Sequence, residues 1–341
     1  MNFMNRRGEG ATAVVTLTHM LVRALYPDLP PFCRHEVPVG DGHVLQVQEY
    51  GCADGVAAVV LHGGPGSGCA PLLRRFFDPG RYRVICVDQR GAGLSRPRGG
   101  VAYNTTAHLL RDLRLVRAHR NISRWLVVGG SWGATLALAH AAAEPEAVAA
   151  LLLRAVFLAR EQDIEWFFQG ARALEPQAWS RFAAVAPASQ QEAMLPFLAQ
   201  ALAQGERAQA GAAALAWWRW EQALAGAGVP SDPSDVLLDG LIDRYRVQSH
   251  YLLHRCWLDA PPLLDRCAAV PGVPTLLLHG LADRVCRPES AQAVQRRLPH
   301  SRVRWIEGAG HDPSHPAMVA AMVGSLERYA AYGDFDVEDA R

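Results

Sequence analysis

The segment from Gly129 to Gly133 reads Gly-Gly-Ser-Trp-Gly and fits the pattern G-x-S-x-G. It lies between an apolar run, Leu126 to Val128, which predicts a strand, and an alanine-rich stretch, Trp132 to Ala143, which predicts a helix. In this context the turn is strained and pushes the serine hydroxyl out of the sheet edge, and the flanking glycines leave room for the neighbouring elements. A glycine-rich turn without chemistry is the alternative. The junction favours Ser131 as a nucleophile that forms an acyl-enzyme.

A serine hydroxyl is a weak nucleophile, so it needs a base and an acid that orients the base. Asp283 follows the apolar run Thr275 to Leu278, and His311 follows the run Val303 to Ile306. These positions give the chain order serine, acid, histidine, and all three residues come at the carboxyl ends of expected strands. We therefore predict a triad of Ser131, Asp283 and His311. Two rivals come one and four residues after the histidine, where a helix is expected to start: Asp312 and His315.

A second glycine-rich loop, His62 to Gly66, follows the apolar run Val56 to Leu61. It has the composition of a loop whose backbone N–H helps to form an oxyanion hole, and the residue after the nucleophile supplies the second N–H. We assign these donors to Gly64 and Trp132, and each such donor contributes about 3 kcal/mol to lowering the barrier. Phosphate or dinucleotide binding is the alternative for this loop and for Gly91 to Gly93. Neither completes G-x-G-x-x-G, and the chain has no G-x-x-x-x-G-K-[ST], so no cofactor is expected.

The elements that must position these residues follow an α/β pattern. Runs that are apolar throughout predict strands covered on both faces, as in a parallel sheet; four of them precede residue 155, at Val56–Leu61, Val84–Val87, Leu126–Val128 and Ala147–Leu153. A helix with an apolar stripe is expected after Thr106, which can cap it. From about residue 157 to 268 strand patterns give way to amphipathic stretches rich in Ala, Gln, Arg and Trp. The expected fold is therefore a mostly parallel sheet flanked by helices, with an inserted all-helical cap (lid) domain.

These patterns divide the chain into a catalytic domain made of residues 23–156 and 269–330 and a cap domain made of residues 157–268. We expect residues 1–22 to be a disordered extension and residues 331–341 to be a loose acidic tail. The apolar run near the N-terminus is interrupted by polar residues and has no small-residue cleavage site after it, and no stretch is long and apolar enough to span a membrane. A cytoplasmic enzyme is the expectation.

The composition is that of a globular enzyme, with 50% apolar residues, 20% charged residues and a formal net charge of +1. A chain so near neutrality gives no electrostatic reason to expect nucleic acid or an anionic membrane as a partner, which leaves a small peptide or small molecule. The seven cysteines are scattered and form no C-x-x-C pair, which indicates reduced thiols. His250, His254 and Cys256 lack a fourth ligand nearby, so we expect helix packing and no metal. Nothing in the sequence specifies an oligomer, and a monomer is the default.

Taken together, the motifs resemble those of the prolyl aminopeptidase (proline iminopeptidase) family of α/β hydrolases. The matching segments extend over nearly the whole chain: His62–Gly66, Asp88–Pro97, Asn104–Thr106, Gly129–Leu138, Leu153–Phe157, Trp217–Glu221 and Gly308–His311. The resemblance implies the α/β-hydrolase fold with a helical lid and the removal of N-terminal proline from peptides. It implies the triad roles above, and it implies that Glu221 pairs with the charged imino group of the substrate. Phe157 and Trp166 resemble walls of an apolar proline pocket, for which core packing is the alternative.

The chain departs from the family pattern where the substrate amine would bind. A second lid acid of the family is replaced by the neutral Gln248, and a Trp-Tyr-Tyr-Gln segment becomes Trp166 to Gln169 without hydroxyl groups. The loss of one of two carboxylates would weaken the binding of a charged amine by about 1.5–3 kcal/mol. An esterase or amidase for a neutral substrate is therefore the alternative to a proline aminopeptidase. The intact motifs argue against a non-catalytic binding protein, and the missing fingerprint argues against a NAD-dependent dehydrogenase.

Overall fold

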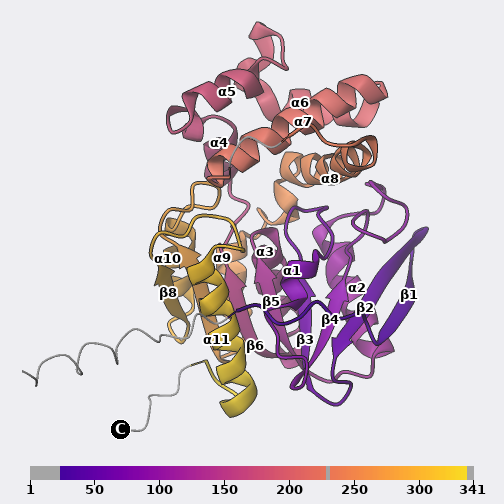
Figure 1. Ribbon diagram of the computed structural model, residues 1–341, viewed down its shortest axis with the longest axis vertical. Helices are drawn as coiled ribbons and strands as arrows, with labels where there is room; N and C mark the ends of the chain where they lie inside the picture. Colours follow the sequence, from indigo (N-terminus) through magenta and orange to yellow (C-terminus); the bar gives the residue numbers. More distant parts are fainter. Residues whose placement is uncertain (1–23, 228–230, 336–341) are drawn as a thin grey trace, which may run out of the picture.

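The computed structural model describes residues 24–227 and 231–335 (Figure 1). The expected disordered extension at residues 1–22 and most of the expected acidic tail, residues 336–341, lie outside the described residues. The tail begins later than the sequence suggested. Helix α11 (Pro316–Tyr332) ends at a left-handed Gly333, and Phe335 is 2% exposed and stacks on Tyr329. The prediction of a loose segment from residue 331 is therefore wrong for residues 331–335, which an aromatic contact fixes to the helix.

The core of the fold is one eight-stranded sheet in the order β1-β2-β4-β3-β5-β6-β7-β8. The strands are β1 Cys33–Gly40, β2 His43–Gly51, β3 Val56–Leu61, β4 Tyr82–Val87, β5 Trp125–Gly130, β6 Val148–Arg154, β7 Thr275–Gly280 and β8 Arg302–Ile306. β1 pairs with β2, and β2 with β4, in antiparallel fashion, whereas β4, β3, β5, β6, β7 and β8 are parallel. The mostly parallel sheet predicted from the apolar runs is confirmed.

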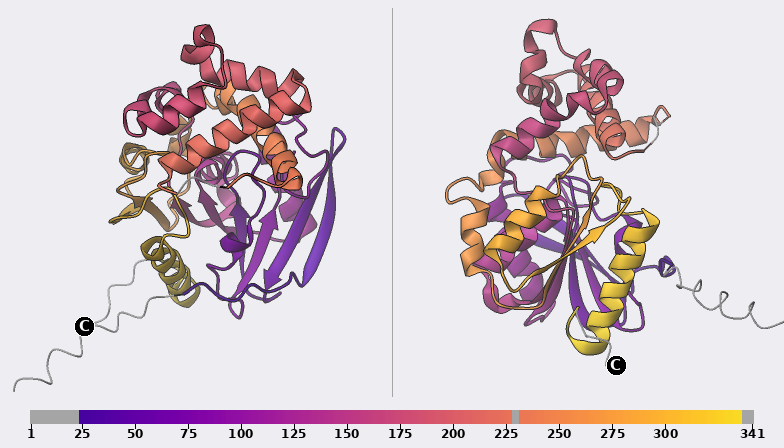
Figure 2. Two further views of the ribbon diagram at one scale, coloured as in Figure 1. Left: turned by 45° about the horizontal axis from the view of Figure 1, so that its top comes forward. Right: turned by 90° about the vertical axis from the view of Figure 1, so that its left-hand side faces the viewer.

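Helices cover both faces of the sheet (Figures 1 and 2). Those around the sheet are α1 Pro71–Arg74, α2 Thr106–His119, α3 Trp132–Ala143, α9 Leu263–Arg266, α10 Glu289–Arg297 and α11. Alternate residues of each strand face opposite ways: Val59 joins the apolar cluster of α2 and α3, and Val60 joins that of α11. The burial of both strand faces explains why these strands are apolar throughout.

The start of α2 differs in detail from the expectation. Its N-cap is Thr105, whose hydroxyl accepts the N–H of His108, and not Thr106. The Thr106 hydroxyl instead donates to the carbonyl of Cys256 at 2.5 Å, and so ties the start of the helix to a segment after the cap helices. Two adjacent threonines are equally suited to capping, and the long-range contact decides between them.

The remaining helices gather above the sheet, over the carboxyl ends of its parallel strands (Figure 1). They are α4 Glu161–Phe168, α5 Pro176–Ala183, α6 Met194–Gln204, α7 Arg207–Leu224 and α8 Asp235–Leu253. Buried aromatic rings hold them together, because Trp217 stacks on Tyr245 and Trp220 stacks on Phe182. None of the described helices combines the length and the hydropathy that a membrane-spanning segment needs.

Candidate active site

Ser131 lies at the turn between β5 and α3, and its backbone has a positive φ of 56° with ψ of −122°. The surrounding glycines are required by close backbone contacts. A Cβ atom on Gly133 would lie 1.9 Å from the carbonyl oxygen of Leu61, and one on Gly129 would lie 2.2 Å from the carbonyl oxygen of Gly133. A serine held in such strained backbone is typical of a functional position.

The acid and the base meet at the ends of two neighbouring strands. Asp283 follows β7, His311 follows β8, and their Oδ2 and Nδ1 atoms are 2.9 Å apart. The other oxygen of Asp283 accepts the N–H groups of Val285 and Cys286, both at 2.9 Å. These bonds fix the carboxylate, which in turn orients the imidazole.

The electrostatics of this pair favour its charged form. Burial opposes ionisation of Asp283, but the adjacent His311 and the hydrogen bonds outweigh it and lower the pKa of the carboxyl group. Burial likewise opposes a charge on His311, but the Asp283 carboxylate outweighs it and raises the pKa of the imidazole to about 10. Arg154 supports the same residue, since its guanidinium donates to the backbone oxygen of His311 at 2.7 Å.

Ser131, His311 and Cys286 line one cavity of about 290 Å³ under the cap helices. The Ser131 Oγ atom lies 3.8 Å from the Cys286 Sγ atom, and among the described contacts no hydrogen bond joins the serine to the imidazole. Catalytic hydrogen bonds commonly tighten only when substrate is bound. The serine and the imidazole border the same cavity, where a bound substrate could bring them into contact.

The two rival residues lie elsewhere. Asp312 accepts hydrogen bonds from the backbone and the hydroxyl of Ser314, at 2.8 and 2.6 Å, and His315 precedes α11 as its N-cap residue. Both are described residues, and neither lines the cavity that contains Ser131.

The glycine-rich loop after β3 borders the nucleophile. A Cβ atom on Gly63 would lie 3.6 Å from the Cβ atom of Ser131, and Gly64, with a φ of 110°, also lines the cavity. Trp132 is the first residue of α3, where backbone N–H groups have no acceptor within the helix. The backbones assigned to the oxyanion hole therefore lie on the two segments that flank the serine.

Sequence reasoning missed the residue that connects these two segments. The side-chain amide of Gln89 donates to the backbone carbonyl of His62 at 3.1 Å and accepts the indole N–H of Trp132 at 2.8 Å. The backbone N–H of Gln89 also donates to the His62 ring at 3.1 Å. Gln89 is 3% exposed. Its place in the Asp88 to Gly91 motif was the available signal, but a motif does not show which partners an amide will find.

The lid residues implied by the resemblance lie on two adjacent helices. Glu221 on α7 and Gln248 on α8 both line the cavity. The Glu221 carboxylate is already engaged, because Arg244 donates to Oε1 at 2.6 Å and the Tyr245 hydroxyl donates to Oε2 at 3.0 Å. Among the described residues the buried Oε1 atom of Gln248 has no hydrogen-bond partner.

The apolar wall differs from the expectation in one residue. Phe157 lines the cavity, but Trp166 does not: its indole N–H donates to the carbonyl of Arg284 at 2.8 Å, and its ring lies 4.7 Å from the Arg287 guanidinium. The assignment of Trp166 to the wall is therefore wrong. The cap helix α4 instead presents three neighbouring apolar residues to the cavity: Ile164, Phe167 and Phe168.

Metal-binding residues do not gather at this site. In the described part of the chain the one cluster of suitable donors is Cys33, His35 and Glu49, on the antiparallel strands β1 and β2. Glu49 already accepts from Arg83 at 2.5 Å and from Arg120 at 2.6 Å, so its charge is neutralised. The imidazoles of His250 and His254 contact backbone carbonyls, at 3.0 and 2.8 Å.

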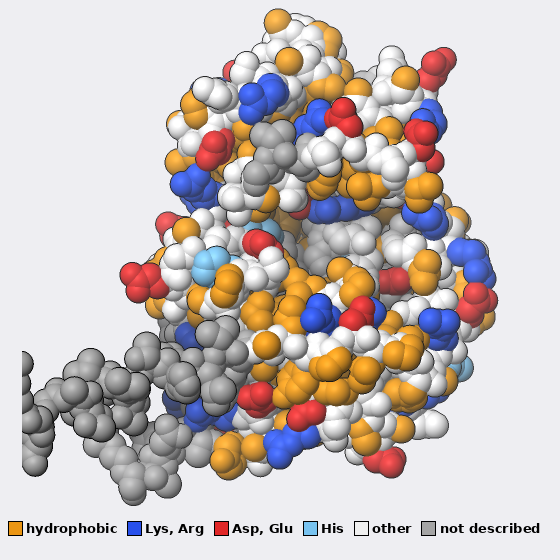
Figure 3. All heavy atoms as spheres, viewed as in Figure 1, with side chains coloured by type: hydrophobic (Ala, Val, Ile, Leu, Met, Phe, Trp, Pro, Cys, Tyr) orange, Lys and Arg blue, Asp and Glu red, His pale blue; other side chains and the backbone are white. Residues whose placement is uncertain are grey.

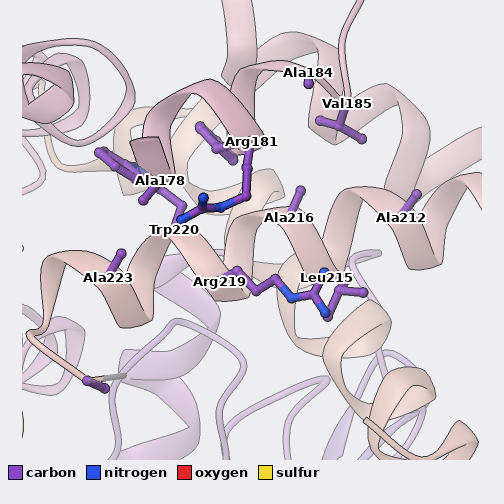
Figure 4. Close-up of a pocket in the computed structure, with 12 residues that line it drawn as sticks. Ala178, Arg181, Ala184, Val185, Ala212, Leu215, Ala216, Arg219, Trp220 and Ala223 are labelled. Atoms are coloured by element: carbon purple, nitrogen blue, oxygen red, sulfur yellow. The ribbon is translucent and has the colours of Figure 1, made fainter. Parts of the chain in front are cut away.

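A second cavity, of about 360 Å³, lies within the cap between α5 and α7. Half of its lining residues are alanine, and Arg181 and Arg219 also line it (Figure 4). Among the described residues that line it there is no hydroxyl nucleophile, thiol, histidine or carboxylate. The candidate active site is therefore the cavity at Ser131, beneath the cap, where the space-filling view shows the surface hollowed between the cap and the sheet-bearing part (Figure 3).

Comparison with known proteins gives the family and the fold. Residues 58–316 match the family model described as alpha/beta hydrolase fold. The chain is 36% identical to a proline iminopeptidase of Xylella fastidiosa (90% of this chain, 100% of the relative) and 35% identical to a probable proline iminopeptidase of Leptolyngbya boryana (91% and 98%). Among solved structures, the proline iminopeptidase of Mycobacterium smegmatis superposes with a TM-score of 0.56 at 20% identity, over 89% of this chain and all of that one, which supports the fold.

Proposed function

Because this chain belongs to the proline iminopeptidase family of α/β hydrolases, we propose that it is a serine aminopeptidase that releases N-terminal proline from peptides. The observation that carries the proposal is the bonded Asp283–His311 pair, which borders the same cavity as Ser131 at the carboxyl edge of the sheet. An oriented base beside a strained serine is the arrangement that acyl transfer requires.

In the proposed reaction His311 takes the proton of Ser131 as the hydroxyl oxygen attacks the carbonyl carbon of the N-terminal residue. The N–H groups of Gly64 and Trp132 stabilise the oxyanion of the tetrahedral intermediate. His311 then gives the proton to the leaving amine, and the acyl-enzyme forms. A water molecule, deprotonated by the same imidazole, hydrolyses the ester and releases proline.

The cavity supports a small, terminal acyl group. Phe157, Ile164, Phe167 and Phe168 give it apolar walls, and the cap helices α7 and α8 close it from above. An extended peptide would have to pass through the cap, whereas a chain end needs only to enter from one side.

Hydrolysis of L-proline arylamide by the purified protein tests the proposal. The wild type is expected to cleave it, Ser131→Ala is expected to be inactive, and a fluorophosphonate probe is expected to label only the wild type. If the wild type is labelled but leaves the prolyl substrate intact, Ser131 is a nucleophile for another substrate and the proline assignment fails.

A second candidate function is an esterase or amidase for a neutral substrate. The Glu221–Arg244 ion pair favours it, because a carboxylate that already has a cation partner attracts a substrate cation less. Activity on short p-nitrophenyl esters without activity on proline arylamide would select this candidate.

A further inference from the structure

The carboxylate expected to meet the substrate amine is held by residues of its own cap. Arg244 and Tyr245 on α8 donate to the two oxygens of Glu221 on α7, at 2.6 and 3.0 Å. The side chains of Glu221 and Arg244 are 15% and 21% exposed, so the pair is largely shielded from water. Shielding strengthens the attraction within the pair and reduces the charge that a third group experiences.

The other charged groups at the cavity do not restore a negative field. Asp163 lines the cavity, but its two oxygens accept from Arg160 at 2.7 and 2.9 Å. Arg154 also lines the cavity at 7% exposure, and no described carboxylate pairs with it. Both carboxylates that line the cavity in the described chain, Asp163 and Glu221, therefore already have a guanidinium partner.

Gln248 is a further polar residue that lines the cavity from the cap. Its side chain carries no charge, and its buried Oε1 atom has no hydrogen-bond partner within the described chain. An unpaired buried acceptor favours a ligand that brings an N–H or O–H donor, whether or not that ligand is charged.

An N-terminal imino group is mostly protonated at pH 7, and it loses its hydration when it enters this cavity. The attraction to a free carboxylate would offset this loss of hydration, but Glu221 in its ion pair offsets little of it. The apolar walls gain the same contacts from a neutral ring of equal shape. The balance leaves ring shape, and not ring charge, as the property that the cavity recognises.

We propose that Arg244 is a specificity-determining residue: by neutralising Glu221, it makes the Ser131 cavity accept a five-membered-ring acyl group irrespective of a positive charge on the ring. The inference rests on the proposed function, because it concerns the acyl group that the same serine would attack.

The test compares L-proline p-nitroanilide with cyclopentanecarboxylic acid p-nitroanilide, in which a CH2 group replaces the ring nitrogen. For the wild type the two kcat/KM values are expected to agree within about threefold. Arg244→Gln keeps a donor for Glu221 and removes the charge, and it is expected to raise the ratio in favour of the prolyl substrate by about tenfold or more.

Matched variants separate charge from structure. Arg244→Lys keeps the charge and should keep the wild-type ratio, and the double variant Arg244→Gln/Glu221→Gln should return to that ratio. A prolyl preference of more than about tenfold in the wild type, unchanged in Arg244→Gln, would overturn the inference and leave the proposed function intact.

Binding to the Ser131→Ala variant gives a readout without turnover. L-Prolinamide and cyclopentanecarboxamide are expected to bind with similar affinity by calorimetry, and the added Arg244→Gln change is expected to favour prolinamide. If the wild type hydrolyses neither anilide, the proposed function fails, and these affinities still decide the inference. The inference would be overturned if neither amide binds. It would also be overturned if Ser131→Ala already prefers prolinamide and the added Arg244→Gln change leaves that preference unaltered.

Discussion

The side-chain oxygen of Gln89 accepts the indole N–H of Trp132 at 2.8 Å, while the amide nitrogen of the same residue donates to the backbone carbonyl of His62 at 3.1 Å. One buried amide thus bridges the glycine-rich loop after β3 and the first residue of α3. These two segments carry the backbone N–H groups assigned to the oxyanion hole, so Gln89 is placed to set the distance between them.

Replacement of Gln89 by Leu should therefore lower kcat more than it changes KM. The variant loses both bridging bonds and leaves the Trp132 indole N–H buried without its acceptor, so the two N–H donors are held less firmly. A loss of about tenfold to hundredfold in kcat on the prolyl substrate is expected, less than the removal of a donor itself would cause. Steady-state kinetics measure it.

Gln89→Glu is the control, because it keeps an oxygen acceptor for the indole N–H of Trp132. It should retain more activity than Gln89→Leu, although the two variants should unfold at similar denaturant concentrations. A Gln89→Leu enzyme with wild-type kcat would show that the bridge does not position the oxyanion hole.

The pH profile of kcat/KM should report the Asp283–His311 pair. His311 acts as a base only when it is neutral, and the Asp283 carboxylate raises its pKa, so activity should rise with pH along a limb that lies above the ordinary histidine value of about 6.5. In Asp283→Asn the carboxylate charge is absent and the limb should move to lower pH. The maximal rate should also fall, by a factor on the order of 10⁴, because the ring loses its orienting partner.

The neighbouring acid Asp312 provides the control for this prediction, and it is measured with the same anilide. Asp312→Asn should keep the wild-type limb, because Asp312 bonds to Ser314 and does not line the cavity. A limb that moves in Asp312→Asn and stays in Asp283→Asn would reverse the assignment of the acid.

The correction at Trp166 gives a test of the cavity wall. Phe167 lines the cavity and Trp166 does not, although they are neighbours on α4. Phe167→Leu should raise KM for the prolyl anilide severalfold, because the ring acyl group loses apolar contact. Trp166→Phe removes the bond to the Arg284 carbonyl and reduces the ring that lies against Arg287, both outside the cavity, so it should leave KM near the wild-type value. The opposite order would return Trp166 to the wall.

The sequence predicted the positions of Ser131, Asp283 and His311 at strand ends because each follows a run of apolar residues whose length and type are set by burial on both faces. The antiparallel strands β1 and β2 were not expected. The outer strand β1 alternates exposed and buried residues and contains Pro38, so it lacks the continuous apolar run that marks the central strands.

The periodicity of the sequence does not predict which side chains on different helices or strands contact each other. Trp166 and Phe167 are both aromatic and adjacent, and only the way α4 packs against α7 and the loop after β7 decides which ring faces the cavity. The partner of Glu221 lies 23 positions later, on another helix, and no local period connects the two residues. Gln89 has the same character, since its three bonds join segments that are distant in the chain.

Breaking the buried Arg90–Asp112 ion pair should strongly destabilise the fold. Both side chains are almost fully buried, and the guanidinium donates to the two carboxylate oxygens at 2.7 and 2.9 Å. Arg90→Met leaves a buried carboxylate without its partner and should lower the free energy of unfolding by about 3–5 kcal/mol. Urea denaturation followed by circular dichroism measures the loss.

Two further variants distinguish burial of charge from loss of packing. Arg90→Met/Asp112→Leu removes the stranded carboxylate and should recover much of the lost stability, since an apolar pair of similar volume can replace a buried ion pair. Arg96→Met breaks an ion pair with Glu36 whose side chains are 59% and 57% exposed, and it should leave the unfolding midpoint unchanged. A double variant no more stable than Arg90→Met would mean that the additional bonds of Arg90, to the carbonyls of Tyr103 and Val39, carry the stability instead.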